Sequence, residues 1–273
     1  MINQIIHDII DASDLLILAD HLERFILYLE SSSNREEDIN KLLHELDILQ
    51  DFFALSDDEP YQILDDELAV NHYLYCCLSD SRHQEETVIF IKAYIDEIRS
   101  HIKNPQGARL SENDINKMMA YLEERFNFCE RLFKSDQLRI SLINNSFDNM
   151  NSVYRALNMG DGSIIHSVFI THEMKNFKYP QIYTLLHELG HVLHTAITRE
   201  PLGIPDSFRE IQELMFRKSL GDTPWQLVEI FADCFVCAAS AGTELESGNP
   251  LSIIHPDDKA VLLHYFDWLM ANI

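Results

Sequence analysis

Apolar side chains recur every three or four positions through most of the chain, a spacing that places them on one face of an α-helix. In the first half this pattern predicts a succession of helices over 14–30, 36–53, 67–78, 85–103 and 111–133. Ser111 has the side chain expected of the N-cap of the last one. The apolar faces of these helices are expected to pack against one another in an ordinary hydrophobic core.

The pattern changes near residue 136. Alternating and β-branched residues predict strands over 138–143, 152–157 and 163–171, with a turn at 159–162. Helical spacing then returns over 181–198, 207–219, 223–241 and 256–271. Strands followed by helices indicate a predominantly helical α+β fold.

We therefore expect two regions. The first, 1–136, is helical, and its role as a docking surface, a cover or a sensor is open. The second, 137–273, carries a small β-sheet and the helix with the candidate chemistry.

Composition narrows the class of protein. The chain has 273 residues, of which 46% are hydrophobic, with only 8 Gly and 8 Pro, so a globular protein is expected. The formal net charge of -24 would repel a phosphate backbone, which argues against direct binding of nucleic acid. The acidity either serves solubility alone or favours a basic protein partner.

The five cysteines are not arranged as a disulfide framework, because their number is odd and Cys76 and Cys77 are adjacent. Cys234 and Cys237 form a CxxC that could bind zinc or perform redox chemistry, but core packing is the preferred interpretation. No signal peptide or membrane-spanning stretch is apparent. A soluble, cytoplasmic protein is expected, with signal-independent export as an open alternative.

The main chemical signal is His187-Glu188-Leu189-Gly190-His191, an HExxH motif inside the predicted helix 181–198. Histidines four residues apart lie one turn apart on one face, and both can reach a single tetrahedral cation. The intervening Glu188 can take a proton from an attacking water. The motif predicts one Zn²⁺ per chain, with His187 and His191 as ligands and Glu188 as the catalytic base. The alternative is a pair of hydrogen-bonded core histidines.

A third ligand is expected from the predicted helix 223–241, where Glu229 and Asp233 share one face among apolar residues. Glu229 is the candidate ligand. Asp233 would accept a hydrogen bond from the free ring nitrogen of a ligand histidine. His194 lies about 10 Å along the helix from His187, so it is expected to line the pocket or support a ligand. If Glu229 is not the ligand, four other acids are available: Glu200, Asp206, Glu210 and Glu213.

Two stretches resemble the gluzincin metallopeptidases, and among these the ImmA/IrrE-like group. They are YTLLHELGHVLH at 183–194 and EIFADCF at 229–235, and the resemblance covers about 135–242. It implies the same ligands, His187, His191 and Glu229, and a catalytic Glu188. It also implies that the strand Ile164–Thr171 holds a substrate backbone by strand addition. Members of that group are often bacterial or phage regulators that cleave a DNA-binding repressor.

The expected function is a zinc-dependent endopeptidase acting on one or a few specific protein substrates, with a basic or DNA-binding regulator as the candidate target. Two alternatives are a non-catalytic helical interaction protein with a structural zinc and a broad-range hydrolase of small peptides. The group that would stabilise the oxyanion is open, with Tyr154, His166 and His255 as candidates. The oligomeric state is also open.

Overall fold

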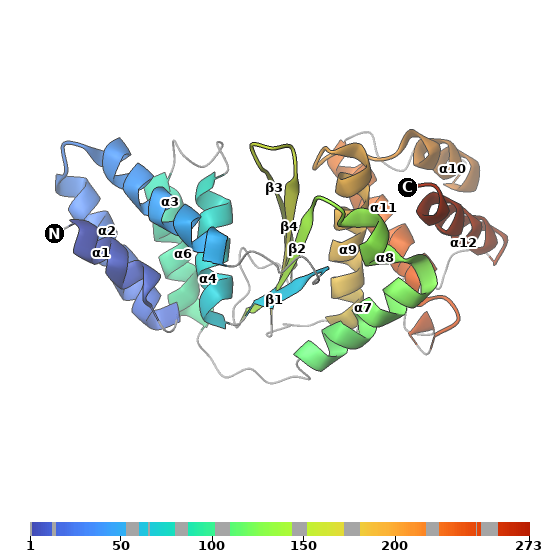
Figure 1. Ribbon diagram of the computed structural model, residues 1–273, viewed down its shortest axis with the longest axis horizontal. Coiled ribbons are helices and arrows are strands. Elements are labelled where there is room, and N and C mark those ends of the chain that lie inside the picture. The colour runs from blue at the N-terminus through green and yellow to red at the C-terminus, as the bar shows by residue number, and fades with distance from the viewer. Residues whose placement is uncertain are drawn as a thin grey trace. The chain divides into compact units, whose positions relative to one another are not determined.

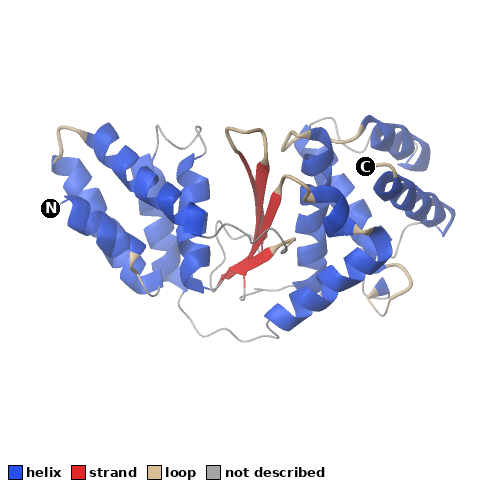
Figure 2. Ribbon diagram, in the orientation of Figure 1, coloured by secondary structure: helices blue, strands red, loops and turns tan. Residues whose placement is uncertain are grey.

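The protein is a predominantly helical α+β structure with one small sheet, as the sequence predicted (Figures 1 and 2). It is seen here in a computed structural model that describes residues 2–12, 15–52, 60–64, 66–79, 87–101, 110–143, 152–171, 181–216, 224–243, 245–246 and 256–273. The elements in the first half are α1 (Ile2–Ile10), α2 (Leu15–Ser31), α3 (Arg35–Phe52), β1 (Gln62–Leu64), α4 (Asp66–Ser79), α6 (Thr87–His101), α7 (Glu112–Phe126) and α8 (Phe128–Leu132). They are followed by β2 (Gln137–Ile143), β3 (Ser152–Asn158), β4 (Ile164–Thr171), α9 (Gln181–Thr198), α10 (Asp206–Phe216), α11 (Pro224–Ser240) and α12 (Pro256–Ala271).

The chain divides into two compact units. Unit 1 comprises Met1–Gly107, Ile140–Asn151 and Phe169–Glu173, and unit 2 comprises Ala108–Arg139, Ser152–Val168 and Met174–Ile273. This spatial division places α7 and α8 with α9 and α11, whereas the sequence analysis assigned them to the first region. The separation of roles between 1–136 and 137–273 remains a prediction.

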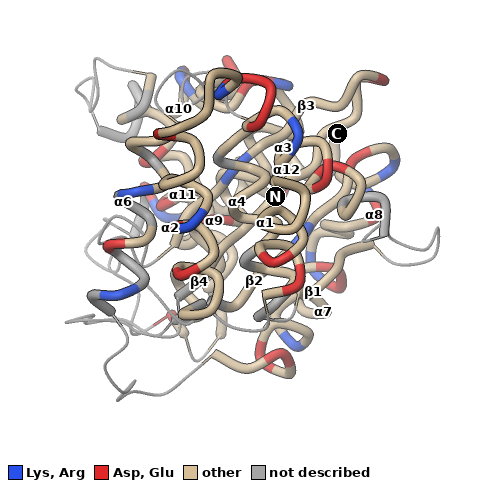
Figure 3. The backbone as a smooth tube through the Cα atoms, turned by 90° about the vertical axis from the view of Figure 1, so that its left-hand side faces the viewer, with Lys and Arg blue, Asp and Glu red and all other residues tan. Residues whose placement is uncertain are grey.

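Unit 1 contains the described helices α1, α2, α3, α4 and α6. Helix α2 buries Leu18, Leu22, Phe25 and Leu29, which lie on one face at helical spacing. On its exposed side, ion pairs join α2 to α6: Arg99 with Asp20 and Glu23, and Lys92 with Glu30. Figure 3 marks the acidic and basic positions along the backbone of both helices. Exposed pairs contribute less than about 1 kcal/mol each, so the buried stripe is the main source of stability.

Two elements of unit 1 were not predicted from the sequence. Helix α1 is short and rich in isoleucine, a β-branched residue with modest helix propensity, yet Ile6 and Ile9 are buried against its neighbours. Strand β1 has only three residues, too few for an alternating pattern to be recognised. Tertiary packing, rather than local pattern, stabilises both.

The helix predicted over 111–133 is interrupted. Ser111 is its N-cap and forms a capping box with Asp114, as the side-chain pattern suggested. The interruption comes at Asn127, whose φ of 50° is left-handed, and α8 starts at the next residue. Asn tolerates this conformation better than most residues, and the Glu123 carboxylate accepts a hydrogen bond from the backbone N–H of Cys129 across the break.

The strands form a four-stranded sheet in the order β1-β2-β4-β3. Strands β3 and β4 are a hairpin closed by the turn at 159–162. The prediction that Ile164–Thr171 holds a substrate backbone is wrong, because this strand is β4 and lies between β2 and β3. Its nearly continuous apolar run is typical of an internal strand. Among the described strands, β1 and β3 are the two edges of the sheet, and β3 is the one that belongs to the hairpin.

Helices α9 and α11 approach each other closely at Gly190. A Cβ atom built on Gly190 would lie 2.7 Å from the Cα of Ala232 and 3.1 Å from its Cβ, closer than a side chain allows. Glycine at this position of α9 and alanine on α11 therefore let the two backbones come together. This contact places Glu229 and Asp233, on either side of Ala232, beside the HExxH motif.

Within the parts of the chain that the structure describes, no helix combines the length and the apolar character needed to cross a membrane.

Substituting Gly190 by Ala should destabilise the protein. Alanine improves helix propensity by about 1 kcal/mol, but the added methyl group meets the backbone of Ala232, and overpacking of this kind costs about 1–3 kcal/mol or more. A net loss of stability is therefore expected in urea unfolding. Gly160→Ala is the control, because nothing lies within 4 Å of its added Cβ, and it should change stability by less than about 0.5 kcal/mol. Equal stability of the two variants would contradict the close-packing argument.

Candidate metal centre

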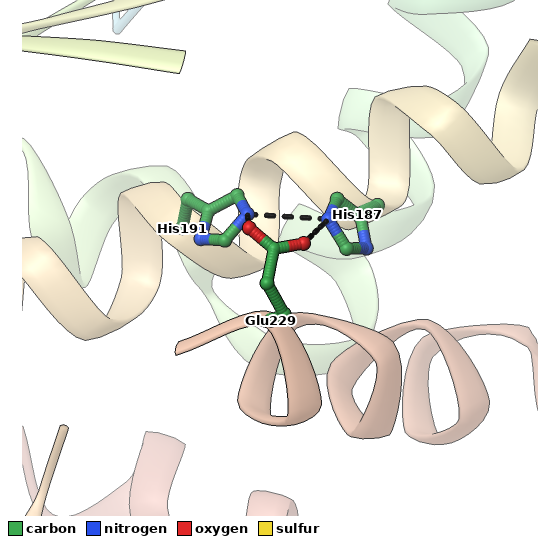
Figure 4. Close-up of side chains that lie close together, drawn as sticks. All are labelled: His187, His191 and Glu229. Carbon is green, nitrogen blue, oxygen red and sulfur yellow. Dashed lines mark hydrogen bonds and ion pairs between the residues drawn. The ribbon is translucent and has the colours of Figure 1, made fainter. Parts of the chain in front are cut away.

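Three side chains from two helices converge on one point (Figure 4). His187 and His191 extend from successive turns of α9, and Glu229 reaches up from α11 between them. The Nε2 atoms of the two histidines are 3.2 Å apart. The Glu229 oxygens lie 3.2 Å from Nε2 of His187 and 3.6 Å from Nε2 of His191.

This donor set fits a metal ion. One ligand atom from each residue lies within 4.8 Å of the other two, which is the spread expected around a single cation. Two imidazoles and a carboxylate match the ligands that zinc takes in catalytic sites. The group is a possible His-His-Glu metal site. Its third member comes from α11, the helix in which the sequence predicted the third ligand.

The second ring nitrogen of each histidine is also engaged. Nδ1 of His187 lies 3.0 Å from Oδ1 of Asp233, and Nδ1 of His191 lies 3.0 Å from Nε2 of His194. Asp233 can only accept, so Nδ1 of His187 carries a proton; a neutral His194 with a free Nε2 accepts from His191 in the same way. With Nδ1 as the donor in each ring, Nε2 is the atom that can ligate a metal, once Nε2 of His187 has lost its proton.

Burial and neighbouring charges divide the histidines into two kinds. Burial would lower the pKa of His187, but the carboxylates of Asp233 and Glu229 outweigh it and raise this pKa to about 10. Burial, together with the charge on His187, lowers the pKa of His191 to about 3, and burial does the same for His194. Without a metal, His187 therefore carries a proton on both ring nitrogens, and its positive charge faces the carboxylates of Asp233 and Glu229. His191 and His194 are neutral.

Glu188 is buried beside the group. Only 5% of its surface is exposed, and burial raises the pKa of its carboxyl group above the ordinary value. Its Oε1 atom accepts a hydrogen bond from the hydroxyl of Ser152, the first residue of β3. The base predicted from the motif is therefore held by the edge strand.

Tyr154, two residues further along β3, stacks on His191, with ring centroids 6.0 Å apart and planes inclined by 16°. Its hydroxyl lies 2.7 Å from Nδ1 of the fully buried His166. Nε2 of His166 lies 3.3 Å from Asp136, so this nitrogen donates and Nδ1 accepts from Tyr154. Tyr154 and His166, two of the candidates for stabilising the oxyanion, are thus hydrogen-bonded to each other.

Asp136 anchors this network. It accepts hydrogen bonds from the backbone N–H of Ile164 and from the guanidinium of Arg199, which also donates to the carbonyl of Gly162 in the hairpin turn. Burial alone would raise the pKa of Asp136, but the hydrogen bonds from His166 and Arg199 lower it to about 2. Arg199 immediately follows α9, so the hairpin is tied to the end of the metal-site helix.

The remaining candidates lie elsewhere. Glu200, Asp206 and Glu210 are exposed and do not belong to the metal group, so none of them is needed as a replacement for Glu229. The side chain of Glu213 and residue His255 lie outside what the structure describes. Cys234 and Cys237 are buried free thiols whose pKa values are raised by burial, which agrees with a packing role.

Sequence reasoning did not find Ser152, Asp136 and Arg199. Ser152 meets Glu188 across 36 residues of sequence, and Arg199 meets Asp136 across 63. The one sequence signal for Ser152 was the alternation of side chains along β3, which places Ser152 and Tyr154 on the same face of the strand.

Comparisons of the chain with protein-family models, with curated proteins and with solved structures found no match.

Zinc binding to the metal-free protein should release at least one proton per chain between pH 7 and 9, of which His187 supplies one and a zinc-bound water adds to it. In that range His187, with a pKa of about 10, still holds the proton that its Nε2 must lose to ligate, whereas His191 and His194 have none to lose. The release should decline as the pH rises through about 10. Titration calorimetry in two buffers of different ionisation enthalpy measures it.

Asp233→Asn is the informative variant in this titration. Loss of the carboxylate should lower the pKa of His187, decrease the proton release at pH 8 and weaken zinc binding by roughly 10–100-fold. Asp206→Asn, at an exposed acid outside the group, should behave as the wild type. Zinc binding without any proton release at pH 8 would contradict the charge state described for His187.

Proposed function

We propose that the chain is a zinc-dependent endopeptidase of the HExxH type. The observation that carries this proposal is the position of Glu188, a buried carboxylate on the same helix as two ligand histidines and next to the three-ligand group. A zinc ion, when bound, would supply an acidic water and polarise a carbonyl group. His187, His191 and Glu229 are the residues that would hold it.

Three ligands and a base favour a catalytic over a structural site. Structural zinc sites are usually closed by four protein ligands, whereas catalytic sites have three and leave a position open. In the part of the chain described here, the grouped ligand atoms come from three residues. A structural site has no use for a buried carboxylate such as Glu188 beside the open position.

The chain's own residues would then move one proton. Glu188 accepts it from the attacking water at a carboxylate oxygen and delivers it to the leaving amide nitrogen. Its burial suits this role, because a carboxyl group with a raised pKa exchanges a proton more readily near neutral pH. Asp233 and His194 keep the two ligand rings in the orientation that this requires.

An extended peptide is the substrate that the sheet would accept. Strand β3 is an edge strand among the described strands, and through Ser152 and Tyr154 it contacts both Glu188 and His191. A peptide added along β3 would form backbone hydrogen bonds with it, which explains affinity without a deep side-chain pocket. This assigns to β3 the role that the sequence analysis gave to β4.

We further propose a specific protein target of basic character, such as a DNA-binding regulator. The support is the net charge of -24, which would accelerate encounter with a basic protein, and the resemblance of 183–194 and 229–235 to the ImmA/IrrE-like group. The helices of unit 1 carry none of the metal ligands described here, so they are available for recognition.

Glu188→Gln should abolish proteolysis and leave zinc content and folding intact, because it preserves the shape of the side chain and removes the base. The measurement is mass-spectrometric mapping of new N-termini in a lysate of cells that express the chain, with zinc determined by elemental analysis. Glu200→Gln, at an exposed acid just beyond α9, is the matched control and should remain active. Persistence of the same cuts in Glu188→Gln would show that Glu188 is not the base. A biological effect of the chain that persists undiminished in Glu188→Gln would favour a non-catalytic interaction protein.

The same mapping should reveal one or very few cleaved proteins. Cleavage of the identified target should slow as salt rises from about 50 to about 300 mM, because the Debye length shortens from roughly 14 to roughly 6 Å and screens the attraction. Rates at each salt concentration, measured on the purified target, test this. Many unrelated cuts, or an acidic target cleaved at a salt-independent rate, would instead indicate a broad-range peptide hydrolase.

A further inference from the structure

Ser152 is the point where the edge strand and the base meet. It is the first residue of β3, and its hydroxyl donates a hydrogen bond to Oε1 of Glu188. Glu188 is almost completely buried, so its carboxylate is oriented by protein groups rather than by bulk water. A serine at the start of a strand carries no functional signal in the sequence by itself.

We infer that Ser152 is a positioning residue of the proposed reaction, which fixes one oxygen of Glu188 so that the other is presented to the attacking water. This inference rests on the proposed function of Glu188. A glutamate side chain turns about three single bonds, and a hydrogen bond to one oxygen removes most of that freedom. Displacement of a reacting group by about 1 Å can cost on the order of 100-fold in rate.

Because Ser152 lies on β3, its hydrogen bond does more than pair a buried carboxylate. Side chains two residues apart on a strand share a face, and Tyr154 on that face stacks on the ligand His191. The strand that would align the substrate backbone therefore also orients the base and one metal ligand. The peptide bond and the carboxylate that acts on it would be placed by the same element.

The rest of the hairpin holds this element in register. Arg199 binds the turn at Gly162, and Asp136 binds the backbone N–H of Ile164 and the side chain of His166. His166 in turn binds the Tyr154 hydroxyl. The hairpin is thus fixed to α9 at its turn and at Ser152, so the Ser152 hydroxyl has little freedom to move away from Glu188.

Three variants test the inference. Ser152→Ala removes the hydroxyl, Ser152→Thr retains it on a residue that suits a strand, and Ser163→Ala is the matched control, because its hydroxyl lies in the same hairpin and binds Asp161 instead. With zinc-loaded protein and a fluorogenic peptide made from the mapped cleavage site, Ser152→Ala should lower kcat by about 10–100-fold and change KM by less than about threefold. Ser152→Thr should recover most of kcat, and Ser163→Ala should equal the wild type.

A second measurement does not depend on peptide hydrolysis. A hydroxamic acid gives up a proton when it ligates a metal, and a carboxylate oriented beside the metal can accept that proton and strengthen the binding. Acetohydroxamic acid titrated into the cobalt-loaded protein, followed by visible absorption, should bind about 5–20-fold more weakly to Ser152→Ala, with recovery in Ser152→Thr and unchanged cobalt affinity.

The outcomes are distinguishable. Wild-type values of kcat and of hydroxamate affinity in Ser152→Ala overturn the inference while leaving the peptidase proposal intact. A wild-type protein that hydrolyses no peptide overturns the proposed function. A general loss of thermal stability in Ser152→Ala, with cobalt affinity reduced in proportion, shows a merely structural role and also overturns the inference.

Discussion

The close approach of α9 and α11 at Gly190 and Ala232 is the contact on which the metal group depends. Glycine allows the backbones to touch, and the distance of 2.7 Å from a hypothetical Cβ to the Cα of Ala232 shows that no larger residue fits without movement. Glu229 precedes Ala232 by one helical turn and Asp233 follows it directly, so the same contact delivers a ligand and the hydrogen-bond acceptor of His187. A glycine that costs helix stability therefore has a clear compensating function.

Much of this arrangement could be predicted from local sequence. The period of the apolar residues located most helices and all three longer strands, and the i, i+4 spacing of the two histidines and of Glu229 with Asp233 identified the faces that meet. The order of the strands could not be predicted in this way. A strand's sequence indicates how deeply it is buried but does not name its neighbours, which is why strand addition was expected at β4, although β4 is an internal strand.

The supporting polar groups were also beyond sequence reasoning, for a related reason. Ser152, Asp136 and Arg199 are unremarkable residue types that acquire a role only where the fold brings distant segments together. His194 and Asp233 could be predicted as supports because each lies on the same helix as a ligand, at a spacing that geometry fixes. The contact of His194 with His191 lies within α9 and is encoded locally. Asp233 shares a helix face with Glu229, so it approaches the histidines together with that ligand candidate. Contacts between the hairpin and α9 follow from the topology.

These hairpin contacts make the register of β3 a chemical constraint. A shift of the strand by one residue would turn Ser152 and Tyr154 to the opposite face, away from Glu188 and His191. The anchor formed by Arg199 and Asp136 sits at the turn, where a shift in register would have to be accommodated. A buried carboxylate is costly unless it is paired, and the low pKa of Asp136 reflects its pairing with His166 and Arg199. The network therefore stabilises one register of β3, and that register is the one that brings Glu188, His191 and the proposed site of strand addition together.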